Sequence, residues 1–287
     1  MKLGFFGMPR EVSSYREAVD ASVANGLQYI ELYNGWEFDG RLSLPELLQN
    51  AGEWKAYADS KGIMVSCFSA HTDVVGPGRE AAITQLKNLA EVCAVVGSPY
   101  LHHTLAPSLD SAAVTDTDMA FERAVSAVRE IYDYAAALGV KCLYEPQGMI
   151  FNGSRAMERL LNEAGREIAL VADVGNPLFV DEPPEQFAAR FADRIAHVHI
   201  KDYLVKERAC GDPGRYWHQT KGGNYLRDTI AGHGHVKLHA VFCSLLKAGY
   251  AGAYSLECSG LEHCHPDAAA LDIENVKRIY QEVQPLI

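Results

Sequence analysis

Four segments rich in β-branched and aromatic residues end in a side chain that can bind a metal ion. These side chains are Glu145 in CLYEPQG, Asp173 in LVADVGN, His199 in HVHIKD and Glu257 in YSLEC. In an eight-stranded α/β barrel the carboxyl ends of the strands meet on one face, so residues far apart in the sequence become neighbours. We therefore predict that these four side chains form one metal site.

Three carboxylates and one imidazole suit Mn²⁺, Mg²⁺, Co²⁺ or Zn²⁺ and differ from the thiolate-rich ligand sets of structural zinc. Such an ion can hold two neighbouring oxygens of a polyol or hydroxycarbonyl compound, which makes the C–H next to the carbonyl more acidic. Glu145 and Glu257 are the candidates to take that proton and to return it. The set predicts one divalent metal ion as cofactor and either isomerisation or epimerisation through an enediolate, or elimination of water.

Eight βα units are needed to place these residues, and the sequence supplies them. The predicted strands are Lys2–Gly7, Tyr29–Tyr33, Met64–Ser69, Tyr100–Thr104, Lys141–Glu145, Ala169–Asp173, Ala196–Ile200 and Ala253–Cys258. Apolar residues three and four apart predict helices over Tyr15–Ala24, Leu44–Ser60, Glu80–Val96, Ala120–Leu138, Ser154–Glu163, Pro184–Phe191, Leu238–Lys247 and Ile273–Val283. This alternation favours a single (β/α)8 TIM barrel over residues 1–287. A doubly wound open sheet is the competing architecture, but its glycine fingerprint is absent after the first strand.

The connection from Asp202 to Val236 is longer than the others, so the barrel is expected to carry a long loop after its seventh strand. Long connections in compact domains are often lids over a site. Because this one follows the strand that carries His199, it is either a lid or a simple insertion.

Composition limits the class of protein. A content of 48% hydrophobic and 22% charged residues is typical of a globular chain, and no apolar run is long enough for a membrane span. A formal charge of −11 disfavours nucleic acid as a partner. The amino terminus has no extended apolar region, and cysteines such as Cys67 and Cys142 lie in apolar segments, so we expect a cytoplasmic protein. A homo-oligomer is compatible with the sequence.

At these residues the chain resembles the xylose-isomerase-like TIM barrel superfamily, in its sugar phosphate isomerase/epimerase branch, over essentially its whole length. The H-x-H-x-K-D element from His197 to Asp202 is the most specific short motif. The resemblance implies a divalent metal held by Glu145, Asp173, His199 and Glu257. It also implies proton transfer by Glu145 and Glu257 on a small carbohydrate substrate.

Three positions depart from the ketose 3-epimerases of this superfamily. Phe151 stands where they carry a further acid, Val205 where they carry arginine, and Asn176 where histidine is frequent. We therefore predict an isomerase or epimerase of a small sugar, sugar phosphate or polyol-derived ketone, but not a free-ketose 3-epimerase. The alternatives are a metal-dependent dehydratase of an inosose- or dehydroshikimate-like ketone and a noncatalytic sugar-binding barrel.

Other residues near the strand ends are candidates for substrate binding. His71, His103 and Lys201 lie where substrate oxygens would be held, although each could instead be a loop or ion-pairing residue. Glu31 also points toward the rim, where a structural role is favoured. We expect His197 to pack or to make a supporting hydrogen bond.

Three further features are open to two interpretations. Phe6 and Trp36 could form an apolar wall beside a sugar ring, but packing is the commoner role for such aromatics. The segment CSGLEHCH, from Cys258 to His265, has the residue types of a second metal site, yet it lacks paired spacing from another segment.

Overall fold

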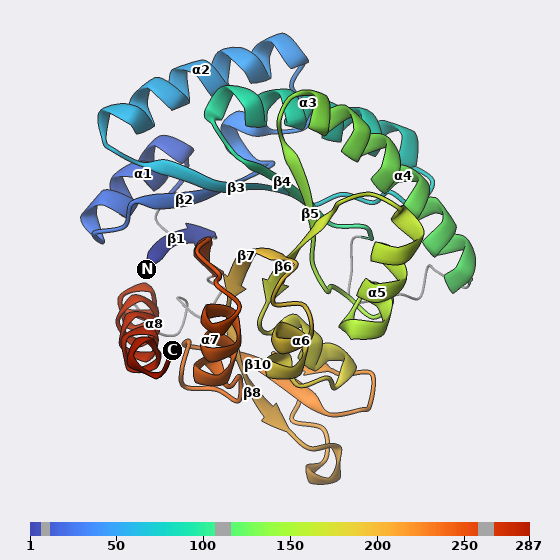
Figure 1. The fold of residues 1–287 in the computed structure, drawn as a ribbon, viewed down its shortest axis with the longest axis vertical. Coiled ribbons are helices and arrows are strands. Elements are labelled where there is room, and N and C mark those ends of the chain that lie inside the picture. Colours follow the sequence, from blue (N-terminus) through green and yellow to red (C-terminus); the bar gives the residue numbers. More distant parts are fainter. Residues whose placement is uncertain (7–11, 107–115, 258–266) are drawn as a thin grey trace.

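The structure is a computed structural model that describes residues 1–6, 12–106, 116–257 and 267–287. Eight parallel strands close into a barrel in the order β1-β11-β7-β6-β5-β4-β3-β2, and the helices lie around its outside (Figure 1). The first and last of these strands complete the closure, with Phe6 beside Glu257. The predicted (β/α)8 barrel is confirmed.

The elements agree with the predicted ones to within a few residues. The barrel strands are β1 (Lys2–Phe6), β2 (Tyr29–Tyr33), β3 (Met64–Ala70), β4 (Tyr100–His103), β5 (Lys141–Tyr144), β6 (Ala169–Asp173), β7 (Ile195–Ile200) and β11 (Ala253–Glu257). The helices are α1 (Tyr15–Ala24), α2 (Leu44–Ser60), α3 (Arg79–Val96), α4 (Thr117–Ala137), α5 (Gly153–Ala164), α6 (Pro184–Arg190), α7 (Leu238–Lys247) and α8 (Ala268–Val283).

Local sequence explains where these helices begin and end. The Asp116 side chain accepts hydrogen bonds from the first backbone N–H groups of α4, and the Asn152 side chain accepts one from Gly153 at the start of α5. These caps satisfy donors that have no partner within the helix. The helices α3 and α5 end at Gly97 and Gly165, both in the left-handed conformation that glycine adopts without a steric penalty.

The alternation of side chains along the strands separates two compartments. Outward residues such as Cys142 and Tyr144 of β5 belong to the large apolar core beneath the helices. Inward residues Cys67, Leu143 and Val171 form a small apolar cluster inside the barrel. Because side chains repeat every second residue, the next inward positions along β5 and β6 are Glu145 and Asp173. The barrel interior therefore changes from apolar to ionisable toward its carboxyl end.

The long connection after β7 is not an irregular loop, because it contains a small antiparallel sheet. Its strands are β8 (Asp202–Lys206), β9 (His218–Gln219) and β10 (Tyr225–Thr229), in the order β8-β10-β9, and this sheet projects from the barrel (Figure 1). Phe179, Tyr203 and Leu226 form an apolar cluster beneath it. The sheet is thus packed against the loop that follows β6.

A buried acid, Asp202, and an exposed acid, Asp181, anchor this sheet. The Asp202 carboxylate accepts hydrogen bonds from the backbone N–H groups of Gly232, Gly234 and Val236 at 2.8–2.9 Å. At the other side, Asp181 accepts from the Thr220 hydroxyl at 2.7 Å and from the Asn224 amide at 2.9 Å. Both ends of the connection are therefore held in place, and closure of this segment as a lid stays a prediction.

No helix among the described residues is long and apolar enough to cross a membrane.

The Asp202 anchor gives a stability prediction. Each of its two carboxylate oxygens accepts hydrogen bonds from two backbone N–H groups. Asp202→Asn replaces one of these oxygens by an NH₂ group, which cannot accept and faces two N–H donors. We expect a loss of about 1–3 kcal/mol in unfolding free energy and faster proteolysis within residues 207–235. Urea denaturation and limited proteolysis measure both effects. Asp212→Asn is the matched control, because the asparagine amide oxygen can still accept the single exposed turn hydrogen bond from the Gly214 N–H; equal behaviour of the two variants would contradict the anchor.

Candidate metal centre

Three of the four predicted ligands lie together at the carboxyl end of the barrel. One ligand atom from each of Glu145, Asp173 and His199 falls within 4.8 Å of the others, and all three residues are buried. The register of neighbouring strands explains the convergence, since Asp173 of β6 lies directly beside His199 of β7. Glu145 follows β5 immediately and its Oε2 lies 3.0 Å from His199 Nδ1.

The fourth predicted ligand, Glu257, lies at the edge of the same cluster. Its Oε2 is 3.8 Å from His199 Nδ1, and its side chain is 26% exposed, which places it at the solvent side of the group. The ammonium of Lys201 connects it to the others, with Nζ 2.8 Å from Asp173 Oδ2 and 2.8 Å from Glu257 Oε2. The structure thus shows Lys201 in an ion pair with two rim acids, and its contact with substrate stays a prediction.

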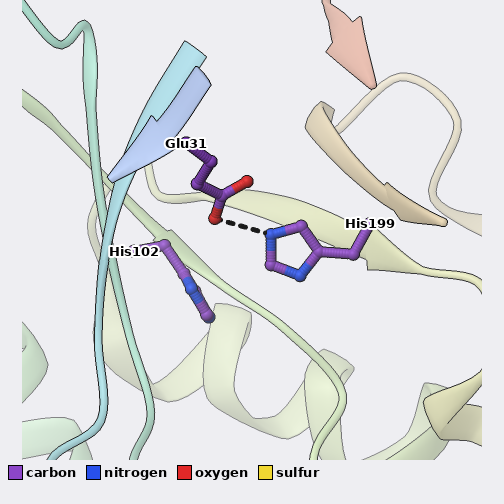
Figure 2. Close-up of side chains that lie close together, drawn as sticks. All are labelled: Glu31, His102 and His199. Carbon is purple, nitrogen blue, oxygen red and sulfur yellow. Dashed lines mark hydrogen bonds and ion pairs between the residues drawn. The ribbon is translucent and has the colours of Figure 1, made fainter. Parts of the chain in front are cut away.

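Beneath this cluster lies a hydrogen-bonded layer centred on Glu31. Its carboxylate accepts from His197 Nε2 at 2.7 Å and from His199 Nε2 at 2.9 Å. Figure 2 shows the bond from His199. The hydroxyl of Ser69 also donates to Glu31 and lies 2.9 Å from His102 Nδ1. The predicted supporting hydrogen bond of His197 is confirmed, and Glu31 is joined directly to a candidate metal ligand.

Of the two adjacent histidines of β4, it is His102 that faces the site. His102 lies beside Ser69 in the register of β3 and β4, and its Nε2 is 3.7 Å from Glu145 Oε1. His103 has the opposite orientation, with Nε2 3.2 Å from the Tyr144 hydroxyl and Nδ1 2.9 Å from the carbonyl oxygen of Thr104. His102 could not be distinguished from His103 in the sequence, because successive side chains of a strand face opposite sides and only the register tells which side is inward.

The remaining predicted residues lie farther from the cluster or outside the described part of the chain. His71 is exposed, with its ring against Tyr33, and its role in substrate binding stays a prediction. The Phe6 ring stacks on His199 with centroids 4.8 Å apart, whereas Trp36 packs edge-on against Tyr15. Most of the segment CSGLEHCH, together with its proposed second metal site, falls within residues 258–266, outside those that the structure describes.

The electrostatics of the cluster show an excess of negative charge. Four carboxylates, those of Glu31, Glu145, Asp173 and Glu257, face two basic side chains, Lys201 and His199. Burial and the charges of Glu257 and Glu145 raise the pKa of Asp173 to about 7, although the Lys201 ammonium opposes this shift. With all four carboxylates ionised and His199 protonated, two negative charges are uncompensated, and one divalent cation can balance them.

Burial and neighbouring charges also shift the pKa values of His199, Glu145 and His102. Burial alone would lower the pKa of His199, but Glu31 and Glu145 on its two sides raise it well above its usual value. For Glu145 burial would raise the pKa, and nearby positive charge lowers it instead. Because burial lowers the pKa of His102 to about 4, that ring is neutral at pH 7. The hydrogen bond from His199 and the charge of Lys201 therefore keep Glu145 ionised.

A divalent metal ion fits Glu145, Asp173 and His199 better than the alternative position nearby. Ligand atoms of Glu31, His102 and His199 also lie within 4.8 Å of one another. However, the Glu31 oxygens already accept three hydrogen bonds, and a metal ion would have to displace donors from them. Asp173 Oδ2 and Glu257 Oε2 have no hydrogen-bond partner among the described residues and share the charge of the Lys201 ammonium, so the upper cluster has both unused lone pairs and excess charge.

Comparison with known proteins agrees with the observed fold. The family model for the xylose isomerase-like TIM barrel matches residues 19–279. The chain belongs to this family.

Individual members of the family differ in their reactions. The inosose dehydratase of Bacillus licheniformis is 29% identical over 143 residues, which are 47% of this chain and 46% of that protein. The chain thus aligns with about half the length of this relative. A zinc-bound IOLI protein superposes with a TM-score of 0.76 at 18% identity, covering 99% of both chains. A 3-keto-D-glucoside 4-epimerase from E. coli gives a TM-score of 0.70 at 18% identity, covering 98% and 99%. The two structures show the shared fold.

Metal binding to this cluster should depend on pH. In the metal-free protein Asp173 and His199 have raised pKa values, so both hold protons that a metal ion must displace. Because the pKa values of Asp173 and His199 are raised in the folded protein, the stability that these two groups contribute is present at low pH. It is lost as the pH rises through their folded-state pKa values. We expect Mn²⁺ affinity to fall at least about tenfold from pH 8 to pH 6, since one proton with a pKa near 7 accounts for that factor.

Isothermal titration calorimetry with Mn²⁺ at both pH values tests this dependence, and buffers of different ionisation enthalpy report the released protons. Asp173→Asn should lose binding, whereas the control Glu182→Gln, which changes a carboxylate at the start of α5, should keep it. Equal affinity at pH 6 and pH 8 without proton release would contradict the assignment.

Proposed function

We propose that the protein is a divalent-metal-dependent isomerase or epimerase of a small sugar, sugar phosphate or polyol-derived ketone. The observation that carries this proposal is that Glu145 and Glu257 both lie beside Nδ1 of His199, one of the proposed metal ligands. Their Oε2 atoms lie 3.0 and 3.8 Å from His199 Nδ1. Two carboxylates beside one ligand can remove a proton from carbon and return it elsewhere.

Glu145, Asp173, His199 and Glu257 are the residues that would hold the ion. When bound, the ion would polarise a carbonyl of the substrate and acidify the neighbouring C–H. These carboxylate and imidazole ligands are compatible with Mn²⁺, Mg²⁺, Co²⁺ or Zn²⁺. A relative in the same fold, the IOLI protein, was solved with zinc.

The side chains divide the proton transfer between them. Glu145 is buried and ionised, so it is suited to accept the proton from carbon. Glu257 is partly exposed and reaches both solvent and Lys201, so it is suited to return a proton to the neighbouring carbon or to the opposite face. The Lys201 ammonium would stabilise negative charge on a substrate oxygen, and Phe6 would cover the His199 ring from water.

Dehydration is the second candidate, and it is favoured by the inosose dehydratases among the relatives. In this reaction the same C–H bond breaks, a C=C bond forms, and the hydroxyl on the next carbon leaves with a proton as water. Glu145 would take the proton from carbon and Glu257 would supply the proton to the leaving oxygen. A free-ketose 3-epimerase is disfavoured, because Phe151 packs against Phe121 with ring centroids 4.8 Å apart and offers no polar group.

A substrate panel in D₂O with Mn²⁺ distinguishes these reactions. The panel includes an inosose, a 3-keto-glucoside, free ketoses and sugar phosphates, each followed by NMR and ultraviolet absorbance. Deuterium incorporation without loss of water would support the isomerase or epimerase, whereas an enone or diketone product would support the dehydratase. Neither reaction with any compound, despite bound Mn²⁺, would favour a noncatalytic sugar-binding barrel.

Glu257→Gln should lower kcat by roughly 100-fold or more on the substrate that the panel identifies, because general acid–base groups contribute about 10²–10⁴ in rate. The control Glu282→Gln alters an exposed acid on α8 that pairs with Arg278. It should keep the activity of the unchanged protein. Full activity of Glu257→Gln would contradict the proton-transfer role.

A further inference from the structure

The buried carboxylate of Glu31 connects several side chains beneath the proposed metal site. Glu31 is 1% exposed, and its two oxygens accept from His197, His199 and Ser69. Since a carboxylate offers about four lone-pair positions, these three donors nearly fill its capacity. Glu31 therefore orients the three side chains that donate hydrogen bonds to it.

The first consequence concerns His199. An ionised carboxylate only accepts hydrogen bonds, so the His199 Nε2 that lies 2.9 Å from Glu31 Oε1 must carry a proton. The other ring nitrogen, Nδ1, then faces Glu145 Oε2 at 3.0 Å. Glu31 thus directs Nδ1, and not Nε2, toward the acids that would share a metal ion.

The second consequence concerns His102, which Glu31 reaches through Ser69. The Ser69 hydroxyl has one hydrogen, which it donates to Glu31, so its oxygen accepts from His102 Nδ1 at 2.9 Å. The neutral His102 ring therefore carries its proton on Nδ1. Its Nε2 is left as a bare lone pair, buried, with no hydrogen-bond partner among the described residues.

The two rings turn their remaining nitrogens toward the same acid. His102 Nε2 lies 3.7 Å from Glu145 Oε1, while His199 Nδ1 lies 3.0 Å from Glu145 Oε2. The rings are edge-on to each other with centroids 5.4 Å apart, and Figure 2 shows both beside Glu31. One carboxylate thus determines which nitrogen of two histidines faces the catalytic side of the barrel.

We propose that Glu31 is a positioning residue that fixes the ring orientation and the protonated nitrogen of His199 directly and of His102 through Ser69. This inference rests on the metal site of the proposed function. His199 Nδ1 is thereby held ready for the metal ion, and His102 Nε2 is held as an acceptor for a hydroxyl group of the substrate. Glu31 itself binds neither the metal ion nor the substrate.

The first measurement is Mn²⁺ affinity by isothermal titration calorimetry. Loss of a carboxylate that orients a metal-bound histidine typically costs about 10–100-fold in affinity, so we expect that loss for Glu31→Ala. Glu31→Gln keeps one acceptor oxygen and should lose less. Ser69→Ala, His102→Gln and the distant control Glu182→Gln should stay within about threefold of the unchanged protein, because His199 keeps its bond to Glu31.

The second measurement reads the protonated nitrogen directly. Two-dimensional NMR of protein with ¹⁵N-labelled histidine, at pH 7.5 and without metal, should show His102 with its proton on Nδ1 alone. Ser69→Ala removes the oxygen that accepts this proton, so His102 should become a mixture of both tautomers. Circular dichroism and the thermal midpoint of each variant confirm that it is folded.

Each outcome decides a separate point. A Glu31→Ala protein that binds Mn²⁺ as tightly as the unchanged protein overturns the positioning role. An equal loss of affinity in His102→Gln and Glu31→Ala also overturns it, because both residues would then be metal ligands. If Glu31→Ala does not fold, an unchanged His102 tautomer in Ser69→Ala refutes the connection. Absence of Mn²⁺ binding in the unchanged protein refutes the proposed metal site, while the NMR result still decides the orientation of His102.

Discussion

The concentration of carboxylates inside the carboxyl end of the barrel is the constraint on which the site depends. Closure of the parallel sheet brings Glu31, Glu145, Asp173 and Glu257 together where water is largely excluded. Charges in such a place repel strongly and lose hydration, so each must find a counter-charge or a donor. Lys201 and His199 balance part of the negative charge. The charge that they leave unbalanced would favour binding of a divalent cation.

The same constraint explains why the site has two levels. In the lower level, the Glu31 carboxylate nearly fills its hydrogen-bonding capacity with donors from His197, His199 and Ser69. The upper level shares one ammonium among several acids and keeps unused lone pairs. A saturated polar network rigidifies its members, whereas an unsaturated one can exchange its partners for a ligand. The lower level therefore orients the histidines, and the upper level is available to bind a ligand.

The sequence predicted the barrel and the four strand-end residues because both follow from local patterns. Strand and helix periodicity needs only neighbouring residues, and an acid at the end of an apolar strand is visible without any tertiary information. The choice between His102 and His103 was not visible, because it depends on the register between β3 and β4. The role of Glu31 likewise depends on contacts with His197 and His199, far away in the chain. The small sheet after β7 was missed, since its short strands are held by Asp202 and Asp181 and not by strong local preference.

Anomalous X-ray diffraction from crystals loaded with Mn²⁺ would locate the metal ion in the barrel. We expect a single strong anomalous peak between Glu145, Asp173, Glu257 and Nδ1 of His199, with the Lys201 ammonium moved away from Asp173. A peak between Glu31, His102 and His199, or no peak within the barrel at full Mn²⁺ loading, would contradict this expectation.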